Sequence, residues 1–387
     1  MLPSPLWFSS GGISQGRTSK RGRARPSWML KGVAIWSPPA RSSCGNFSYT
    51  QSSREDHFAA GRRVPWLTNA TFSPKGCLSS IRFPLDSFFQ QLINGLALGS
   101  IYGLIALGYT MVYGVLRFIN FAHSDVLMLG AYAAFFLAPK VQEVVPLPGL
   151  AGALIVMLLA ALICAAIGML IEFLAYRPLR SRPKLTVLIT AIGVSLFIEF
   201  TCQHKAVFGA ANRAFPKLID FPNFTFFGLT FTSLNVIIVL VTAALLAGMW
   251  FIVQRTRTGA AMRAVSFNQQ AAALMGININ RIITFTFGLG SALAAVAGVL
   301  YALGAPAIEP LMGTQPGLRA FIAAVVGGIG NLPGAVLGGI LLGLLETFAG
   351  GIPGLSTYRD AIAFAILILI LLFKPAGLLG KATVEKV

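Results

Sequence analysis

Charged residues are scarce in this sequence. They make up 11% of its 387 residues, whereas an average soluble domain carries about 25%. Hydrophobic residues account for 56% of the chain, and the mean hydropathy is +0.75. This shortage of charge excludes a water-exposed globular protein.

Residues that build metal and enzyme sites are also few. The four cysteines and three histidines lie far apart, without a CxxC or HxxxH pair, which argues against a disulfide framework or a zinc site. The sequence has no Walker-type phosphate loop and no HExxH motif, so it shows no means of hydrolysing ATP. We therefore predict that the chain is not an enzyme and that it holds no metal or cofactor of its own.

Acidic residues are fewest near the N-terminus. The whole chain has 30 Lys and Arg against 12 Asp and Glu, and residues 1–85 contain 12 of the basic residues but only Glu55 and Asp56. The segment is rich in Ser, Gly and Pro and has no apolar periodicity, so we predict that 1–84 is a disordered basic extension outside the working protein. The same composition suits a transit peptide or a nucleic-acid-binding arm. N-terminal sequencing of the purified protein would show whether this segment is retained.

Long apolar runs fill the rest of the chain. Runs of about 18 apolar residues are long enough to cross a membrane as helices. The sequence therefore predicts an all-α, polytopic transmembrane helix bundle of about seven to nine spans over 85–380, with runs at 87–116, 121–138, 149–171, 185–198, 232–253, 282–308, 320–345 and 361–373.

Basic loops give the orientation of these spans, because Lys and Arg are enriched in loops that stay in the cytoplasm. Two loops and the C-terminal end qualify: Arg177, Arg180, Arg182 and Lys184; Arg255, Arg257, Arg263 and Arg281; and Lys374, Lys381 and Lys386. With these segments in the cytoplasm, the run 282–308 ends on the outer side, and the run 361–373 crosses from the outer side to the cytoplasm. The run 320–345 must therefore enter the membrane and return to the outer side.

A helix-breaking sequence lies at the centre of that run. Residues 327–334 read GGIGNLPG, and such a break is tolerated at membrane depth only inside protein or beside a water-filled cavity. We predict a broken or re-entrant segment near 320–348. Small residues at every fourth position predict close helix packing, at Gly95, Gly99 and Gly103, at Gly334 with Gly338, and at Gly339 with Gly343.

The densest polar cluster precedes the second apolar run. On a helix, Asn120, His123 and Ser124 would share a face, with Asp125 to one side. Two interpretations stay open. One is a polar helix start, with Asn120 as the N-cap and Arg117 paired with Asp125. The other is a break that lines a substrate path.

Other acidic residues lie near the ends of the predicted spans. We expect Glu172 to pair with Arg177 at the membrane interface, and we expect water to reach Glu199 and Glu346. No chain of Asp, Glu and His residues indicates a proton relay.

The segment 254–281 is too polar to insert into a membrane and is rich in helix formers. It predicts one or two short helices that end at Gly276. Ala271, Ala272, Leu274 and Met275 would form a small apolar patch, which indicates a docking helix for a partner.

Several segments of the sequence resemble those of a known family. The sequence QAAALMGI at 270–277 resembles the EAA-type coupling motif of ABC importer permeases. Four further segments look like the branched-chain amino-acid permeases of the LivH type: GYTMVYGV at 108–115, INFAH at 119–123, TGAAMRAV at 258–265 and AAVVGGIGNLPGA at 323–335. The resemblance covers 85–379.

Two positions depart from the family pattern. Gln270 stands where the coupling motif usually has glutamate, which removes a possible charged contact with the ATPase. Ser124 stands where a glycine usually follows the histidine, which adds a hydroxyl near the expected path.

The resemblance implies a role for this chain and a set of partners. The partners would be a second homologous permease, two cytoplasmic ATP-binding subunits that hold the ATP, and a periplasmic protein that captures leucine, isoleucine or valine. The chain would be a multi-pass protein of the bacterial inner membrane, in contact with lipid and with no nucleic acid. It would work by alternating access.

The resemblance also implies roles for single residues. Coupling to the ATPase would use Gly259, Arg263, Gln270, Ala271, Ala272 and Gly276, and the substrate path would be lined by Asn120, His123, Ser124, Asp125 and Asn331. Urea and short-chain amide permeases look much alike and stay open as an alternative, as does an ion-coupled secondary transporter.

Overall fold

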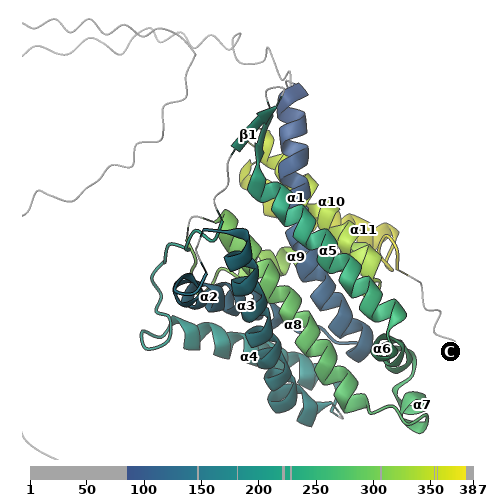
Figure 1. Cartoon of the computed structure of the whole chain (residues 1–387). Coiled ribbons are helices and arrows are strands. Elements are labelled where there is room, and N and C mark those ends of the chain that lie inside the picture. The colour runs from purple at the N-terminus through teal and green to yellow at the C-terminus, as the bar shows by residue number, and fades with distance from the viewer. Residues whose placement is uncertain are drawn as a thin grey trace, which may run out of the picture. The chain divides into compact units, whose positions relative to one another are not determined.

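The computed structural model describes residues 85–380, apart from 146–147, 181, 220–222, 227–228, 306, 353 and 355. The predicted extension 1–84 lies outside the described residues. Eleven α-helices make up most of the described part (Figure 1): α1 (Leu85–Leu116), α2 (His123–Gln142), α3 (Leu150–Ile171), α4 (Lys184–Gln203), α5 (Ser233–Arg255), α6 (Arg257–Phe267), α7 (Gln269–Leu274), α8 (Ile279–Gly304), α9 (Thr314–Gly327), α10 (Leu332–Gly351) and α11 (Arg359–Phe373).

Short elements connect some of these helices. A π-turn (Glu172–Tyr176) and a 3-10 turn (Arg177–Leu179) continue α3, and another 3-10 turn (Ser356–Tyr358) precedes α11. Strands β1 (Asn223–Phe226) and β2 (Leu229–Thr232) form an antiparallel hairpin before α5, with Asn223 opposite Thr232. This hairpin is the only addition, among the described residues, to the predicted all-α architecture.

Eight of the described helices are long and apolar enough to cross a membrane. They are α1, α2, α3 with its extension to Leu179, α4, α5, α8, α10 and α11. The prediction of a polytopic helix bundle is therefore confirmed.

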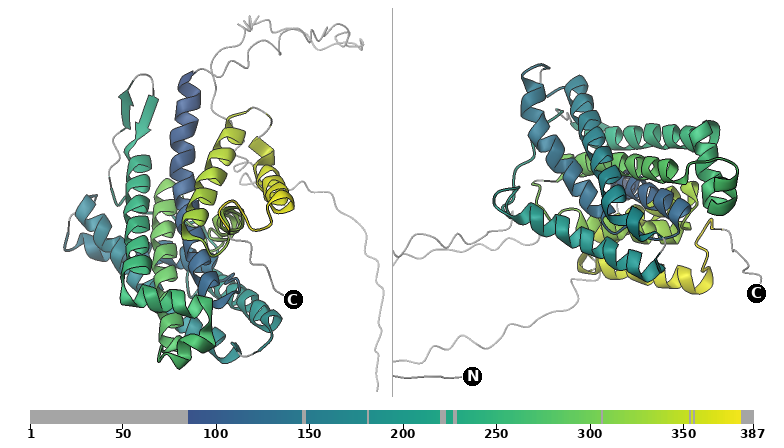
Figure 2. Two further views of the ribbon diagram at one scale, coloured as in Figure 1. Left: turned by 90° about the vertical axis from the view of Figure 1, so that its right-hand side faces the viewer. Right: turned by 90° about the horizontal axis from the view of Figure 1, so that it is seen from below.

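The centre of the bundle is formed by α1 and α8. In the most apolar stretch of each helix, 89% of α1 and 78% of α8 is buried, against 17% of α4 and 6% of α11. Figure 2 shows α1 in the middle of the bundle when it is seen from below, with α4 and α11 at the periphery. The apolar side chains of α4 and α11 therefore lie largely exposed on the outside of the bundle.

The predicted break divides the apolar run 320–345 into two helices. Helix α9 ends at Gly327, and α10 begins at Leu332 with Pro333 in its first turn. Between them, Gly328 and Gly330 have φ values of 108° and 93°, a region that glycine adopts without steric cost. The chain thus folds back on itself, and the predicted broken segment near 320–348 is confirmed.

The two backbones of α1 and α10 lie in direct contact at glycines. A methyl group added to Gly99 would lie 2.7 Å from the Cα atom of Ile340, and one added to Gly339 would collide with the backbone of Gly103. On its other face α10 is equally close to α9, because Gly334 and Gly338 lie against the carbonyls of Gly327 and Ala323. Small residues permit this spacing, and it fixes the broken segment to the central helix.

Candidate functional site

The segment 254–281 forms two short helices, α6 and α7, as its composition predicted. Each helix starts at a side-chain cap. The hydroxyl of Thr256 accepts a hydrogen bond from the amide of Gly259 (3.0 Å), and the side chain of Asn268 accepts one from the amide of Ala271 (3.1 Å). Figure 1 shows both helices at one end of α5.

Helix α7 ends at Leu274, two residues before the predicted end at Gly276, which closes the turn after the helix. Gly276 has a φ of 79°. Its amide donates to the carbonyl of Ala273 (3.0 Å), and the amide of Ile277 donates to the carbonyl of Ala272 (3.1 Å). This pair of bonds is a Schellman motif, which satisfies the last carbonyls of the helix.

Helix α6 is held against the end of α5. A methyl group on Gly259 would collide with the carbonyl oxygens of Ile252 and Val253. Arg263 donates a hydrogen bond to the carbonyl of Val253, where a cation also interacts favourably with the helix C-terminus. These contacts leave α6 little freedom to move without α5.

Both short helices are also tied to the end of α1. Gln269 donates to the carbonyl of Val115 (3.1 Å), and Arg117 donates to the carbonyl of Ser266 (3.4 Å). Arg117 therefore does not pair with Asp125, and that part of the polar-helix-start interpretation was wrong.

A small cavity lies between helix α6 and the broken segment. It has a volume of about 90 Å³ and lies between the ends of α1 and α5, helix α6 and the break itself. The residues that line it include Val115, Val253, Met262, Arg263, Gly330 and Leu332. Helix α6 and the turn between α9 and α10 thus border the same cavity.

Exposed apolar side chains lie on α6 and at the end of α7. Phe267, Leu274 and Met275 have relative exposures of 87%, 89% and 83%. Ala271 is also exposed, but Ala272 is only 4% exposed and packs inward against the bundle. The predicted patch is thus corrected, because Ala272 is not part of the exposed surface.

The C-terminal segment caps the end of α9. The amides of Leu378 and Leu379 donate to the carbonyls of Val326 (2.8 Å) and Gly327 (3.0 Å), and Asn331 donates to the carbonyl of Leu379 (2.7 Å). The last carbonyls of a helix lack intrahelical partners and need partners from protein at membrane depth. Asn331 thus binds the C-terminal segment, a contact that no pattern in the sequence indicates.

We expect that ending the chain at Ala376 will destabilise the protein relative to a chain ending at Gly380. The shorter chain leaves the carbonyls of Val326 and Gly327 without their donors, at about 1–3 kcal/mol for each buried group. The midpoint of thermal unfolding in detergent measures this cost. Equal midpoints would show that water replaces the cap.

The polar residues before α2 are buried. Helix α2 begins at His123, and Ala122 occupies the N-cap position without a side-chain bond, so the expectation that Asn120 caps the helix was wrong. Asn120 instead accepts a hydrogen bond from the hydroxyl of Tyr176 (2.6 Å), and Asp125 accepts one from Ser195 (2.5 Å). These contacts join α2 to the end of α3 and to α4.

His123 and Ser124 pack against neighbouring helices. His123 is 2% exposed, and its ring centroid lies 4.7 Å from that of Tyr109 on α1. Ser124 donates to the carbonyl of Phe121 (2.9 Å) and leaves no room for a methyl group on Gly313 or Gly317. The structure therefore gathers four of the five expected path residues at the start of α2, whereas Asn331 lies at the break.

One charged cluster within the bundle was not predicted. Arg319 of α9 forms ion pairs with Glu346 of α10 (2.8 Å) and Asp360 of α11 (2.7 Å), and the hydroxyl of Tyr102 donates to Glu346 (2.9 Å). Glu346 is only 7% exposed, which contradicts the expectation that water reaches it. Glu199 is half-buried and accepts a hydrogen bond from Thr314 (3.0 Å).

A second charged cluster corrects the expected partner of Glu172. This carboxylate is fully buried and forms its ion pair with Arg180, not with Arg177. The hydroxyl of Thr284 also donates to it (2.6 Å). The cluster joins the end of α3 to the start of α8.

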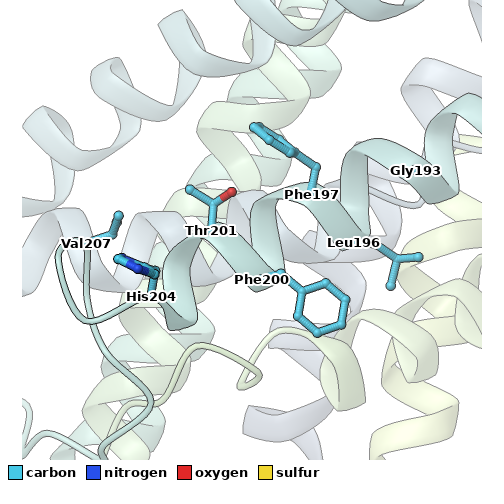
Figure 3. Close-up of a pocket in the computed structure, with 7 residues that line it drawn as sticks. All are labelled: Gly193, Leu196, Phe197, Phe200, Thr201, His204 and Val207. Carbon is cyan, nitrogen blue, oxygen red and sulfur yellow. The ribbon is translucent and has the colours of Figure 1, made fainter. Parts of the chain in front are cut away.

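A hollow of about 640 Å³ lies on the outer side of α4. Figure 3 shows Phe197 and Phe200 pointing to different sides of the helix, with His204 at its end and Val207 in the loop beyond. The lining is mostly apolar, open to the surroundings and formed by α4 and that loop. None of its lining residues belongs to α6 or α7.

Comparisons with known proteins agree with the resemblance of the motifs. The family described as "Branched-chain amino acid transport system / permease component" matches residues 91–371. The high-affinity branched-chain amino acid transport system permease protein BraD of Pseudomonas aeruginosa is 43% identical over 309 residues, which cover 78% of this chain and 98% of BraD. The permease protein LivH of Escherichia coli is 40% identical over 312 residues, with the same coverage.

A more distant relative is the probable branched-chain amino acid transport permease protein LivH of Methanocaldococcus jannaschii. It is 30% identical over 298 residues, which cover 72% of this chain and 88% of that protein. No solved structure matches the chain. These relatives are transport permeases, which confirms that the chain is a transport subunit and not an enzyme. The chain belongs to the branched-chain amino acid transport system permease family.

Proposed function

We propose that this chain is the permease subunit of an ATP-driven importer of leucine, isoleucine and valine in the bacterial inner membrane. It would pair with a second homologous permease, two cytoplasmic ATPases that bind the ATP, and a periplasmic binding protein. The observation that carries this proposal is the position of α6 and α7. Exposed apolar side chains lie on α6 and at the end of α7, and the inner side of α6 borders the cavity beside the break between α9 and α10.

The contacts of α6 and α7 suit the transmission of force. Each helix has a rigid start, and hydrogen bonds from Gln269 and Arg263 tie them to α1 and α5. Movement of an ATPase docked at Leu274 or Met275 would therefore be transmitted to the helix ends around the break. Gly330, which has no atom within 4 Å of an added Cβ, gives this turn room to change.

We propose that the cargo passes beside the start of α2, where Ser124 meets α9. Gly313 and Gly317 lie against Ser124 with no space between them, so this contact is closed in the present conformation. If α9 moves with the break, this contact opens first. Asn120, His123 and Asp125 would then border the opening with polar groups.

The variant Leu274→Asp with Met275→Asp tests the coupling role. We expect at least a tenfold loss of ATP-dependent leucine uptake, because each apolar side chain buried at an interface contributes about 1.5–3 kcal/mol. The unfolding midpoint should not change, since both side chains are exposed. Uptake is measured in proteoliposomes that contain this chain, the partner permease, the ATPases and the binding protein. Docking is measured by co-purification of the ATPases with this chain.

Val144→Asp is the matched control, because Val144 is 84% exposed in the loop after α2, at the other end of the bundle. Full uptake and ATPase binding by the double variant would contradict the coupling role. Urea uptake without leucine uptake would support the role as an ATP-driven permease but identify a different substrate. Uptake that needs no ATP would favour the ion-coupled alternative.

A further inference from the structure

A polar pocket lies between the ends of α3 and α8, next to the loop that leaves α7. It has a volume of about 430 Å³. Its polar lining consists of Arg177 from the turn after α3 and of Asn278, Asn280, Arg281 and Thr284 from the start of α8. The proposed ATPase contact uses none of these side chains.

The pocket exists because two closely packed helices separate here. One turn deeper in the bundle, a methyl group on Gly288 of α8 would lie 3.0 Å from Met169 of α3. Beyond Met169, α3 unwinds into the π-turn Glu172–Tyr176 and the 3-10 turn Arg177–Leu179. Such π-turns are frequent at functional sites, and this one places Arg177 at the pocket.

The pocket has a net positive charge. Glu172 is the neighbouring carboxylate, and it is fully engaged by Arg180 and Thr284. Burial lowers the pKa of Arg180 to about 10, so its guanidinium stays charged at neutral pH. In the part of the chain that the structure describes, Arg177 and Arg281 form no salt bridge.

The guanidinium of Arg177 is held in place without an anion. It lies over the ring of Phe173, 5.4 Å from the ring centroid, an arrangement that leaves its N–H groups free to donate. Arg281 follows Asn278, whose side chain caps α8 by accepting from the amide of Arg281 (3.1 Å). Two cations thus border one cavity, and a ring contact holds that of Arg177 in place.

Exposed apolar side chains adjoin the charged part of the pocket. Met169 is 37% exposed, Phe173 55% and Phe285 38%, and Met169 and Phe285 line the pocket itself. All three lie on the membrane-spanning parts of α3 and α8. A ligand that fills this site therefore needs both a phosphate-like group and apolar chains.

We propose that the pocket between α3 and α8 binds an anionic phospholipid. Its phosphate lies between Arg177 and Arg281, and its acyl chains lie along Met169 and Phe285. Basic pockets between membrane helices on the cytoplasmic side bind anionic headgroups, and guanidinium groups suit phosphate oxygens. The apolar wall favours a lipid over a soluble phosphate or an acidic side chain of a partner protein.

Native mass spectrometry of the full chain, expressed with its partner subunits, tests the proposal. Phosphatidylglycerol is the probe and phosphatidylcholine the comparison lipid. Each arginine near the surface should change binding by about fivefold, so Arg177→Gln with Arg281→Gln should weaken phosphatidylglycerol binding by about 25-fold. Arg182→Gln, on the same loop but outside the pocket, should retain it.

Three results would overturn the proposal. One is equal binding of phosphatidylcholine and phosphatidylglycerol by the unchanged chain. Another is complete displacement of phosphatidylglycerol by soluble glycerol 3-phosphate, which would identify a free phosphate site. The third is a double variant that keeps its phosphatidylglycerol but loses its ATPase subunits, which would assign both arginines to a protein contact. The readout is lipid binding, so it is separate from the test of transport.

Discussion

The variant Gly339→Leu is expected to abolish the folded form of the bundle. The Cβ of a side chain at this position would collide with the backbone N and Cα atoms of Gly103, and it would lie 3.0 Å from the carbonyl oxygen of Gly99. Backbone atoms of α1 can yield only if the whole helix shifts. Because α1 is the most buried helix, such a shift would also disturb its contacts with α8 and α9.

The smaller change Gly339→Ala gives a measurable intermediate. Overpacking of this kind costs about 1–3 kcal/mol, which fluorescence-detected size exclusion after heating can resolve in detergent. Gly248 of α5 is the matched control, since it has no atom within 4 Å of an added Cβ. Gly248→Ala should be neutral or stabilising by up to about 1 kcal/mol. A stable, monodisperse Gly339→Leu protein would contradict the close contact of α1 and α10.

The variant Arg319→Met is expected to destabilise the protein by about 3–5 kcal/mol, the usual cost of leaving one member of a buried ion pair alone. Arg319 bonds to three helices at once, through Tyr102, Glu346 and Asp360. Without it, the carboxylate of Glu346 keeps only the hydroxyl of Tyr102 as a partner. The loss should appear as a lower unfolding midpoint in detergent.

Two further variants distinguish the roles within this cluster. Asp360→Asn should cost no more than about 1 kcal/mol, because Asp360 is 54% exposed and exposed ion pairs contribute little. Arg319→Met combined with Glu346→Met removes both buried charges and should recover much of the stability. If Asp360→Asn were as damaging as Arg319→Met, burial would not govern the energy of this cluster.

The broken segment could be predicted from the sequence because two independent patterns agreed. Counting spans between basic loops required the run 320–345 to return, and the glycines and proline at 327–334 marked where it turns. The short helices and the turn at Gly276 could be predicted equally well, because helix caps and C-terminal glycines depend on only a few neighbouring residues. Local sequence signals and the count of membrane crossings together predicted the framework of the bundle.

The partners of charged residues could not be predicted in the same way. Glu172 pairs with Arg180 because α3 unwinds into a π-turn, and nothing in the apolar pattern marks that turn. Arg117 and Asp125 diverge because α2 starts at His123 and Arg117 adopts a φ of 55°. A change of a few residues in a helix boundary redirects each side chain, so spacing alone assigned wrong partners.

The cluster around Arg319 was within reach of sequence reasoning. Arg319 directly precedes the run 320–345, and Glu346 directly follows it. Once the run is known to fold back, its two ends lie near each other, and an arginine and a glutamate there are natural partners. The contact of the C-terminal segment with α9 had no such signal, because backbone amides carry it and any residue except proline supplies one.

The cap on α9 has a consequence for the order in which the protein is completed. Val326 and Gly327 obtain their donors from Leu378 and Leu379, about 50 residues later in the chain. At ribosomal rates those residues take roughly 3–10 s to synthesise. During that interval α9 is already made but its last carbonyls lack these donors, so the end of α9 can be capped only after residues 378–379 have been synthesised.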